Sequence, residues 1–436
     1  MMFVGRNDLV LPAFILSPSS TDKRRAYGRA VIEPKTPLFP SLEDFRTQLK
    51  NTRNTAVADL DSLVMQLSET LRRLPNIEVV LASDGQQALK AIHKACGTTT
   101  TIAINQSSVV NHELSSGLTK DGFQLVDSYS GEFSRFEDRF VNYSQLPGAP
   151  ENQLLASFSA SNLADLRATS IESNGVKDFV GLLGVNAISA RDGTVFLMEH
   201  FCNISKVFQQ ARKLILVVAL EKVVPGNEEA RLQTLAMGIF GWEIRLLGLG
   251  NKGGDNQLQD IPFVKSSDAD PKVLVIVMDN GRRQLINGPY RELLLCIGCR
   301  ACIRSCPTQQ FFGANSGLSP KEYLYYFIQG QSSSLDLCLN CGMCHVECPL
   351  DIDVSGMIIK ARSQWPQKGS LASTLLANFE LLSQWGSEMP GAANALLGNR
   401  MPRWFADRVL GISKDAPVPK FHKDTLGSWL KRRKSQ

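Results

Sequence analysis

Cys296-Ile-Gly-Cys299-Arg-Ala-Cys302-Ile-Arg-Ser-Cys306-Pro307 is the stretch that decides the fold of this chain, and Cys338-Leu-Asn-Cys341-Gly-Met-Cys344-His-Val-Glu-Cys348-Pro349 repeats its pattern. Both runs have the spacing C-x2-C-x2-C-x3-C-P, which is typical of modules that bind two [4Fe–4S] clusters. Three cysteines in close succession can surround one cubane if the chain turns tightly. The proline then redirects the chain, so that the fourth sulfur reaches the other cubane.

This crossing predicts two sets of four ligands. Cys296, Cys299, Cys302 and Cys348 are assigned to the first cluster, and Cys338, Cys341, Cys344 and Cys306 to the second. Of the ten cysteines, only Cys96 and Cys202 lie outside this region, and we interpret them as core thiols. Disulfides suit short secreted chains, and structural zinc usually takes two separated pairs of ligands. Neither alternative fits triplets followed by Cys-Pro.

The segment between the runs predicts a helical module. Ser319-Pro-Lys-Glu322 is a capping box with proline at the first helical position, and Gly330 ends the helix that it opens. The 31 residues between Cys306 and Cys338 are too many for a compact small ferredoxin. The module therefore resembles the helical ferredoxins of succinate dehydrogenase and heterodisulfide reductase subunits, and a further helix is expected through Met357–Arg362.

Charges beside the two runs suggest unequal reduction potentials. Arg300 and Arg304 lie in the first run, whereas Asp336, Glu347, Asp351 and Asp353 surround the second. Positive charge favours a reduced cluster, so the first cluster is expected to have the higher potential.

The N-terminal region has the pattern of an α/β domain. A helical stretch over residues 45–75 is followed by short apolar strands at Glu78–Leu81, Thr101–Ile104, Phe123–Val126, Phe196–Met198, Leu214–Leu220 and Val273–Met278. Helices such as Gln86–Cys96 intervene. This alternation predicts a mainly parallel sheet.

Length and charge limit the remaining possibilities. The 436 residues leave room for two or three domains of ordinary size. We divide the chain into four segments: an N-terminal arm at 1–44 lying over another subunit, an α/β domain at 45–290, the two-cluster module at 291–360, and C-terminal helices with an extended basic tail at 361–436. With 47 Lys and Arg against 42 Asp and Glu, the net charge of +5 is too small to predict nucleic-acid binding. No apolar run has the length of a membrane helix, so we expect a cytoplasmic protein.

The order of the motifs carries a family resemblance. Phe179-Val-Gly-Leu-Leu-Gly-Val-Asn186, Leu216-Val-Val-Ala-Leu-Glu-Lys-Val-Val-Pro225 and Val277-Met-Asp-Asn-Gly-Arg282 precede the first cysteine run, and Ser107-Ser-Val-Val-Asn-His-Glu113 comes earlier. This order resembles the lactate-utilisation (LUD) domain proteins, specifically the iron–sulfur type called LutB or LldF. The resemblance implies a domain similar in fold to ribose-phosphate isomerase and the CoA-transferases.

The resemblance also implies a function. It predicts a cytoplasmic electron-transfer subunit of a complex that oxidises lactate or a similar 2-hydroxy acid, with a cysteine-rich-domain subunit and a second LUD protein as partners. The chain departs from the family where Lys-Ser-Lys-Ser becomes Asn105-Gln-Ser-Ser108, which removes both lysines. The alternatives are a relay in a heterodisulfide-reductase-like, flavoprotein or quinone-linked complex, with the LUD domain as docking platform, and a cluster-bearing metabolite or redox sensor.

Few residues outside the cysteines are candidates for a substrate site, and no catalytic residue is predicted. Glu221 ends a strand, as a site residue does in CoA-transferase-like folds, although as an exposed ion pair with Lys222 it would need no function. The loop Asp192-Gly193-Thr194 could hold an anion with its backbone N–H groups or be a plain turn. Gly248-Leu-Gly-Asn-Lys-Gly253 spells a dinucleotide fingerprint, but no helix pattern follows it, so we predict a surface loop.

Overall fold

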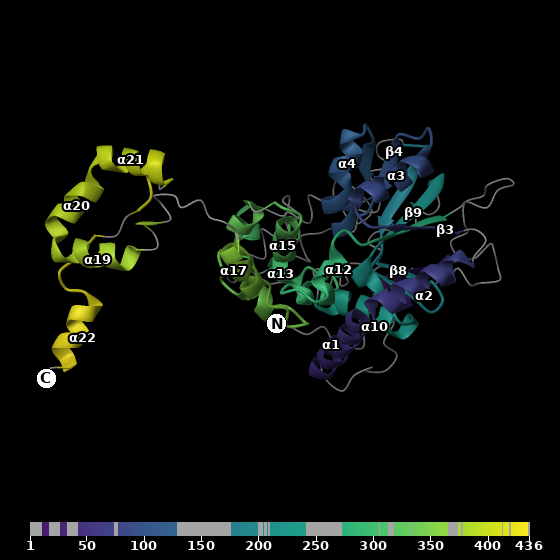
Figure 1. Ribbon diagram of the computed structural model, residues 1–436, viewed down its shortest axis with the longest axis horizontal. Coiled ribbons are helices and arrows are strands. Elements are labelled where there is room, and N and C mark those ends of the chain that lie inside the picture. The colour runs from purple at the N-terminus through teal and green to yellow at the C-terminus, as the bar shows by residue number, and fades with distance from the viewer. Residues whose placement is uncertain are drawn as a thin grey trace, which may run out of the picture. The chain divides into compact units, whose positions relative to one another are not determined.

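The computed structural model describes residues 11–16, 27–32, 42–73, 77–128, 176–198, 204, 207, 210–240, 273–304, 306–312, 318–331, 333–364, 374–375, 378–411, 413–417 and 420–434. The chain forms two compact units, Met1–Arg362 and Ser363–Gln436. Figure 1 shows the helices and strands of each unit. Within the described ranges, no helix is long and apolar enough to cross a membrane.

A six-stranded, all-parallel sheet forms the centre of the first unit. Its order is β3-β11-β9-β6-β4-β5. The strands are β3 (Ile77–Ala82), β4 (Thr101–Ile104), β5 (Gln124–Asp127), β6 (Val180–Gly184), β9 (Lys213–Ala219) and β11 (Val273–Met278). The parallel α/β prediction is confirmed, and the predicted strands that belong to this sheet lie within one residue of the observed ones. No side chain of β11 is exposed, because helices and a second sheet cover its two faces.

Alternating residues of the central strands pack into two separate hydrophobic cores, one on each face of the sheet. Val275 and Val277 pack with α2 (Leu60–Arg72), whereas Leu274 and Ile276 pack with α3 (Gly85–Cys96). The π-helix η2 (Val109–Leu114) and α4 (Ser115–Lys120) extend the α3 layer, which lies beside β4 in Figure 1. The helical stretch predicted over 45–75 is two helices, because the chain turns at Asp59 between α1 (Leu42–Ala58) and α2.

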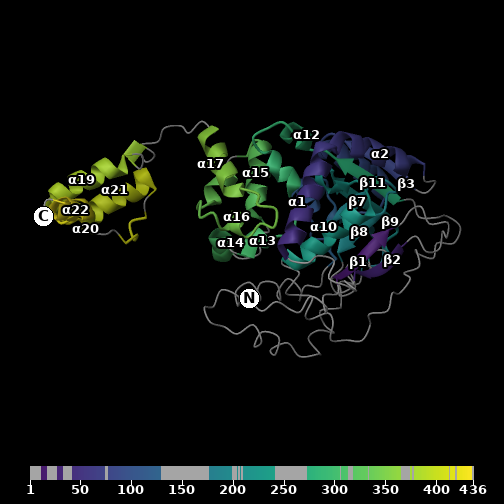
Figure 2. The same cartoon turned by 90° about the horizontal axis from the view of Figure 1, so that it is seen from below.

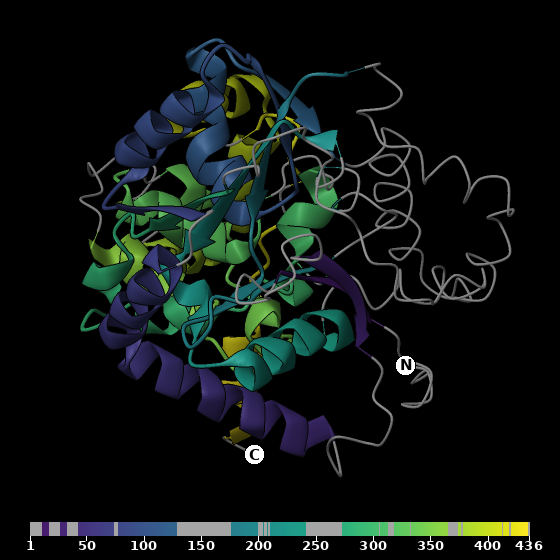
Figure 3. The same cartoon turned by 90° about the vertical axis from the view of Figure 1, so that its right-hand side faces the viewer.

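A second, smaller sheet changes the interpretation of residues 1–44. Its order is β10-β7-β8-β1-β2, with β7 (Ala187–Ser189), β8 (Val195–Met198) and β10 (Val223–Val224). β1 (Leu11–Leu16) pairs with β2 (Tyr27–Ile32) and with β8, and Figure 3 shows this hairpin at the sheet edge. The prediction of an arm is therefore wrong for these two strands. Their partner strand lies about 180 residues further along the chain, and no local pattern could reveal that pairing.

The cysteine-containing region is helical, as predicted. It contains η4 (Arg291–Leu295), α13 (Ala301–Arg304), α14 (Pro307–Phe312), α15 (Pro320–Ile328), η6 (Ser333–Leu337), α16 (Met343–Val346) and α17 (Val354–Gln364). The capping box of Ser319 and Glu322 is present. The hydrophobic core of the cysteine-containing region also includes residues of α1 and of α10 (Asn227–Phe240). Figure 2 shows α1 between this region and the sheets. The α/β domain and the cysteine module therefore form one compact unit.

The second unit consists of α19 (Phe379–Glu388), α20 (Pro390–Gly398), α21 (Arg400–Leu410) and α22 (Leu426–Lys434). The basic run Lys431–Lys434 lies in α22, so the prediction of an extended tail is wrong. Thr425 and Ser428 cap this helix reciprocally: the Thr425 Oγ1 accepts the Ser428 N–H at 3.1 Å, and the Ser428 Oγ accepts the Thr425 N–H at 2.9 Å.

Candidate iron–sulfur site and the adjoining polar network

The structure brings the eight cysteines of the two runs together in two groups. Burial raises the pKa of the Cys302 thiol, and the neighbouring thiols of Cys296, Cys299 and Cys348 raise it further. Burial also raises the pKa of Cys344 to about 11, with contributions from Cys338, Cys306 and Cys341. Each group therefore combines three cysteines of one run with the fourth cysteine of the other. We call them group 1 (Cys296, Cys299, Cys302, Cys348) and group 2 (Cys338, Cys341, Cys344, Cys306).

Both runs turn in the same way around their groups. The residue before the second cysteine has positive φ in each run, at Gly298 (85°) and Asn340 (55°). The residue after that cysteine does as well, at Arg300 (60°) and Gly342 (75°). Two left-handed residues around one cysteine produce the tight turn that three closely spaced thiols need. The backbones of α13 and α16, which follow the two turns, are in contact.

The fourth cysteine of each run receives backbone hydrogen bonds. Burial raises the pKa of Cys306, and the N–H groups of Thr308 and Gln309 in α14 oppose this rise. Leu350 and Ile352 donate to Cys348 in the same way, although burial still raises its pKa to about 11. Pro307 is the first residue of α14, where its missing N–H costs nothing. The proline therefore starts a helix whose first N–H groups stabilise a thiolate.

The donor chemistry of both groups fits a [4Fe–4S] cluster. Eight sulfur donors in two sets of four match the four-cysteine ligation of such clusters. Buried thiols that repel one another as thiolates need cations between them, and ferric and ferrous iron meet that need. In the described part of the chain, no group of three or more His, Cys, Asp or Glu is close enough to hold a single metal ion. The sulfurs around a cubane lie farther apart than ligands of one ion.

A buried polar network lies at the carboxyl ends of the large sheet. Arg282, after β11, is 2% exposed; its Nη2 donates to Glu113 Oε1 at 2.6 Å and its Nε to Glu221 Oε2 at 2.5 Å. The Asn280 amide donates to Glu113 Oε2 at 2.6 Å. Burial alone would raise the pKa of Glu221, but the charges of Arg282, Lys222 and Lys321 lower it to about 2. In parallel α/β sheets, ligands bind at the carboxyl ends of the strands.

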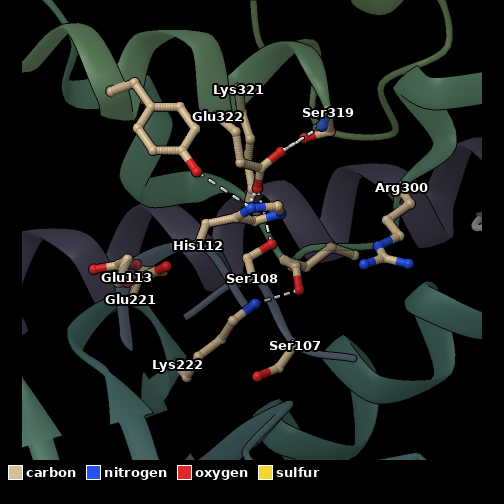
Figure 4. A network of polar contacts seen from close by, with 12 residues as sticks. Ser107, Ser108, His112, Glu113, Glu221, Lys222, Arg300, Ser319, Lys321 and Glu322 are labelled. Atoms are coloured by element: carbon tan, nitrogen blue, oxygen red, sulfur yellow. Dashed lines mark hydrogen bonds and ion pairs between the residues drawn. The ribbon is translucent and has the colours of Figure 1, made fainter. Parts of the chain in front are cut away.

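Helix α15 of the cysteine module closes this network from the other side (Figure 4). Glu322 Oε1 accepts from the Ser108 hydroxyl at 2.8 Å, and its Oε2 accepts from the Ser319 N–H at 2.7 Å. Lys321 Nζ lies 3.7 Å from Glu322 Oε1. The Tyr326 hydroxyl lies 3.4 Å from His112 Nδ1. The network therefore joins the α/β domain to the cysteine module.

Cations of the α/β domain reach the backbone that carries group 1. The Arg53 guanidinium is fully buried and donates to the carbonyls of Leu294 and Leu295 at 2.8 and 3.2 Å. Lys222 Nζ donates to the Ile297 carbonyl at 2.5 Å. Burial and the charge of Lys321 lower the pKa of Lys222 to about 8, although Glu221 and the Cys296 thiolate oppose this. Positive charge thus surrounds the Cys296 side of group 1.

Group 2 has a more open environment. Its Cys341 is exposed, whereas no member of group 1 is. The Asn340 N–H lies 3.4 Å from the Cys338 sulfur. Among the described residues, Arg362 binds this backbone, and its Nη2 donates to the carbonyls of Leu335 and Cys338 at 2.5 and 2.6 Å.

The two candidate substrate sites have different surroundings. Glu221 belongs to the buried network and pairs with Arg282, so the alternative of an exposed pair with Lys222 is wrong. In the loop 192–194, the Thr194 N–H donates to Asp192 Oδ1 at 3.0 Å and the Gly193 N–H to the Ser189 carbonyl at 2.9 Å. Those N–H groups serve the turn itself. Cys202 and the Gly248–Gly253 loop lie outside the described residues.

The sequence alone did not identify four members of the network. Glu113, Arg282 and the adjacent pair Lys321–Glu322 come from three separate segments, and only the fold places them together. The signal that was available is the position of Arg282, just after a fully apolar strand. A charged residue at that point of a parallel strand lies at the ligand-binding edge of the sheet.

Comparisons with known proteins agree with both halves of this description. Residues 64–237 match the family described as "LUD domain", and residues 292–352 match the "4Fe-4S dicluster domain". The chain therefore carries an LUD domain followed by a 4Fe-4S dicluster domain, and it is an iron–sulfur protein.

Over most of its length the chain is similar to curated proteins named Lactate utilization protein B. The protein of Bacillus cytotoxicus is 23% identical over 397 residues, which are 82% of this chain and 79% of that protein. The protein of Bacillus cereus strain AH820 is 23% identical over 411 residues, 83% of this chain and 82% of that one. No solved structure matches the chain. The resemblance inferred from the motif order is confirmed.

Proposed function

We propose that this protein is the iron–sulfur electron-transfer subunit of an oxidoreductase that converts lactate or a similar 2-hydroxy acid to the keto acid. The observation that carries the proposal is that Lys222 and Arg53 bind the backbone carbonyls of Ile297 and Leu294, on either side of Cys296 of group 1. The name of the curated relatives supports lactate utilisation. We expect a cytoplasmic complex with a cysteine-rich-domain subunit, a second LUD protein or a flavoprotein.

The residues divide the work as follows. Group 1 and group 2 are proposed to hold one [4Fe–4S] cluster each. Such clusters supply single-electron transfer when bound. Arg53 and Lys222 hold the backbone of the first cysteine loop in place, and Glu113, Glu221 and Arg282 fix the strand edge beside it. No described residue is assigned to the two-electron chemistry of the hydroxy acid, which we place on a partner subunit.

A second candidate rests on Asn105. This residue stands where the family has its first lysine, and both ends of its buried amide bond to the Gly184 backbone at 2.9 Å. The position is therefore structural and provides no cation for a carboxylate substrate. This favours a relay subunit that uses another electron donor, with the LUD domain as docking platform.

Anaerobic purification of the protein from native cells, together with its attached subunits, distinguishes the two proposed functions. Under the leading proposal, L-lactate produces the paramagnetic resonance signal of reduced [4Fe–4S] clusters. Glycolate and 2-hydroxybutyrate are tested in the same assay as alternative 2-hydroxy acid substrates. If dithionite reduces the clusters but every hydroxy acid fails, the first proposal is wrong and the relay stands. Absence of iron from the pure protein contradicts both.

A further inference from the structure

The surface around Cys341 is unusual within the first unit. Leu339, Met343 and Val346 flank this exposed cysteine and are 68%, 38% and 69% exposed. They are three of the six large apolar side chains exposed in the described part of Met1–Arg362. We call Leu339, Cys341, Met343 and Val346 the Cys341 patch. The patch covers the loop before α16 and the two ends of that helix. Exposed apolar side chains that gather at one place on a surface mark an interaction site.

The segment of chain that carries the patch contains acidic residues and no strongly basic ones. Between Lys321 and Lys360 the sequence contains no lysine or arginine. The carboxylate of Asp351 is paired with Arg46 and Lys50 at 2.8 and 3.0 Å, but Asp336 on η6 is exposed and Glu347 follows α16 directly. The thiolates of group 2 add negative charge. The patch is therefore an apolar centre on an acidic segment. Among the described residues, the nearby cations Arg46 and Lys50 are paired with Asp351, and Arg362 is bonded to the Cys338 carbonyl.

We propose that the Cys341 patch is the docking surface for a one-electron carrier protein whose own cofactor edge lies within a basic surface. This inference rests on the proposed electron-transfer function. Opposite charge steers the encounter, and an apolar contact around one exposed ligand brings the two cofactors close. A patch of four residues suits the small interfaces of redox encounters, which bury less than about 1,200 Å². No cysteine of group 1 is exposed, so group 2 is the better placed of the two for this contact.

The test uses the full-length protein with both clusters reconstituted and reduced, mixed anaerobically with ferric cytochrome c, a basic one-electron carrier. One electron passes from the reduced cluster to the haem iron, which becomes ferrous, and no bond or proton changes. Stopped-flow absorbance of the haem gives the second-order rate constant. Lysines in place of two apolar residues, Leu339→Lys with Val346→Lys, are expected to lower it at least tenfold at low salt.

Two controls make the result specific. Met65→Lys changes an equally exposed apolar residue on α2, at 64%, and is expected to leave the rate within twofold. Leu339→Met keeps the apolar surface and the rate. A small neutral quinone should oxidise all variants equally, which shows that their clusters are intact. If cytochrome c reacts equally with the double variant and the wild type, or slows equally with Met65→Lys, the docking proposal is overturned while cluster-based electron transfer stands. Failure of the wild-type clusters to form or reduce contradicts the proposed function itself.

Discussion

Groups 1 and 2 have the same cysteine spacing and the same left-handed turns, yet their surroundings differ. Group 1 lies against the LUD domain, where Arg53 and Lys222 bind its backbone and a buried ion network stands behind them. Group 2 lies at the surface, with an exposed cysteine and one arginine on its backbone. The repeated motif thus provides two similar groups of cysteines. The rest of the fold covers group 1 and leaves group 2 at the surface.

The largest expected effect comes from breaking the crossing between the runs. Cys306→Ser should remove the same resonance signal as Cys341→Ser, although these residues belong to different runs. Cys348→Ser should remove the other signal, together with Cys299→Ser. Each change should cost about four of eight irons per chain, because a cubane needs all of its thiolates. Iron analysis and paramagnetic resonance check this, with Cys96→Ser as the unaffected control. Pairing of Cys306 with Cys299 would contradict the crossed assignment.

The next effect concerns the network behind group 1. Glu221→Gln removes a negative charge that faces the buried Arg282 guanidinium and should destabilise the protein by roughly 3 kcal/mol at neutral pH. The pKa of Glu221 is lowered from 4.5 to about 2, so its stabilisation is complete above pH 4.5 and disappears as the pH falls through 2. The difference between the two unfolding curves should therefore shrink from pH 5 to pH 2.

Denaturant titrations followed by circular dichroism measure that difference, since acid damage to the clusters is common to both proteins. Asp61→Asn is the control, because the Asp61–Arg283 pair at 2.6 Å is exposed and should contribute less than about 1 kcal/mol. A constant difference between the wild type and Glu221→Gln over this pH range would disprove the role of Glu221.

A substitution of Lys222 tests whether the LUD domain changes the reduction potential of the first cluster alone. Lys222→Met keeps the volume of the side chain and removes a charge near Cys296, so the first cluster's potential should fall by on the order of 50 mV. The second cluster's potential should move much less. A redox titration monitored by paramagnetic resonance separates the two, and Lys94→Met, at an exposed lysine, is the control. Equal shifts in the reduction potentials of both clusters would mean that Lys222 does not act on group 1 alone.

The sequence predicted what depends on local pattern. Cysteine spacing predicted which cysteines gather in group 1 and which in group 2. Apolar runs predicted five of the six strands of the large sheet, all except β6. Charges within the runs suggested that the first cluster has the higher potential, but the cations found at group 1 include Arg53 and Lys222, from distant segments. The hairpin of β1 and β2 was missed for the same reason. Contacts between residues far apart in sequence leave no local trace, so the network could be located only from the fold.

The smallest effect tests the equivalence of the two turns. Arg300 and Gly342 hold the same place after the second cysteine of each run, but only glycine takes a positive φ without cost. Arg300→Gly should therefore stabilise the protein by about 0.5 kcal/mol, since relief of backbone strain exceeds the added freedom of the unfolded chain. The Arg300 Nη2 also donates to the Gln106 carbonyl at 3.5 Å, which is at the long limit of a hydrogen bond. Gly342→Ala should cost about 1 kcal/mol in the same thermal unfolding measurement. A loss of stability in Arg300→Gly would mean that the Arg300 side chain supports group 1, and the two turns would then differ in role as well as in sequence.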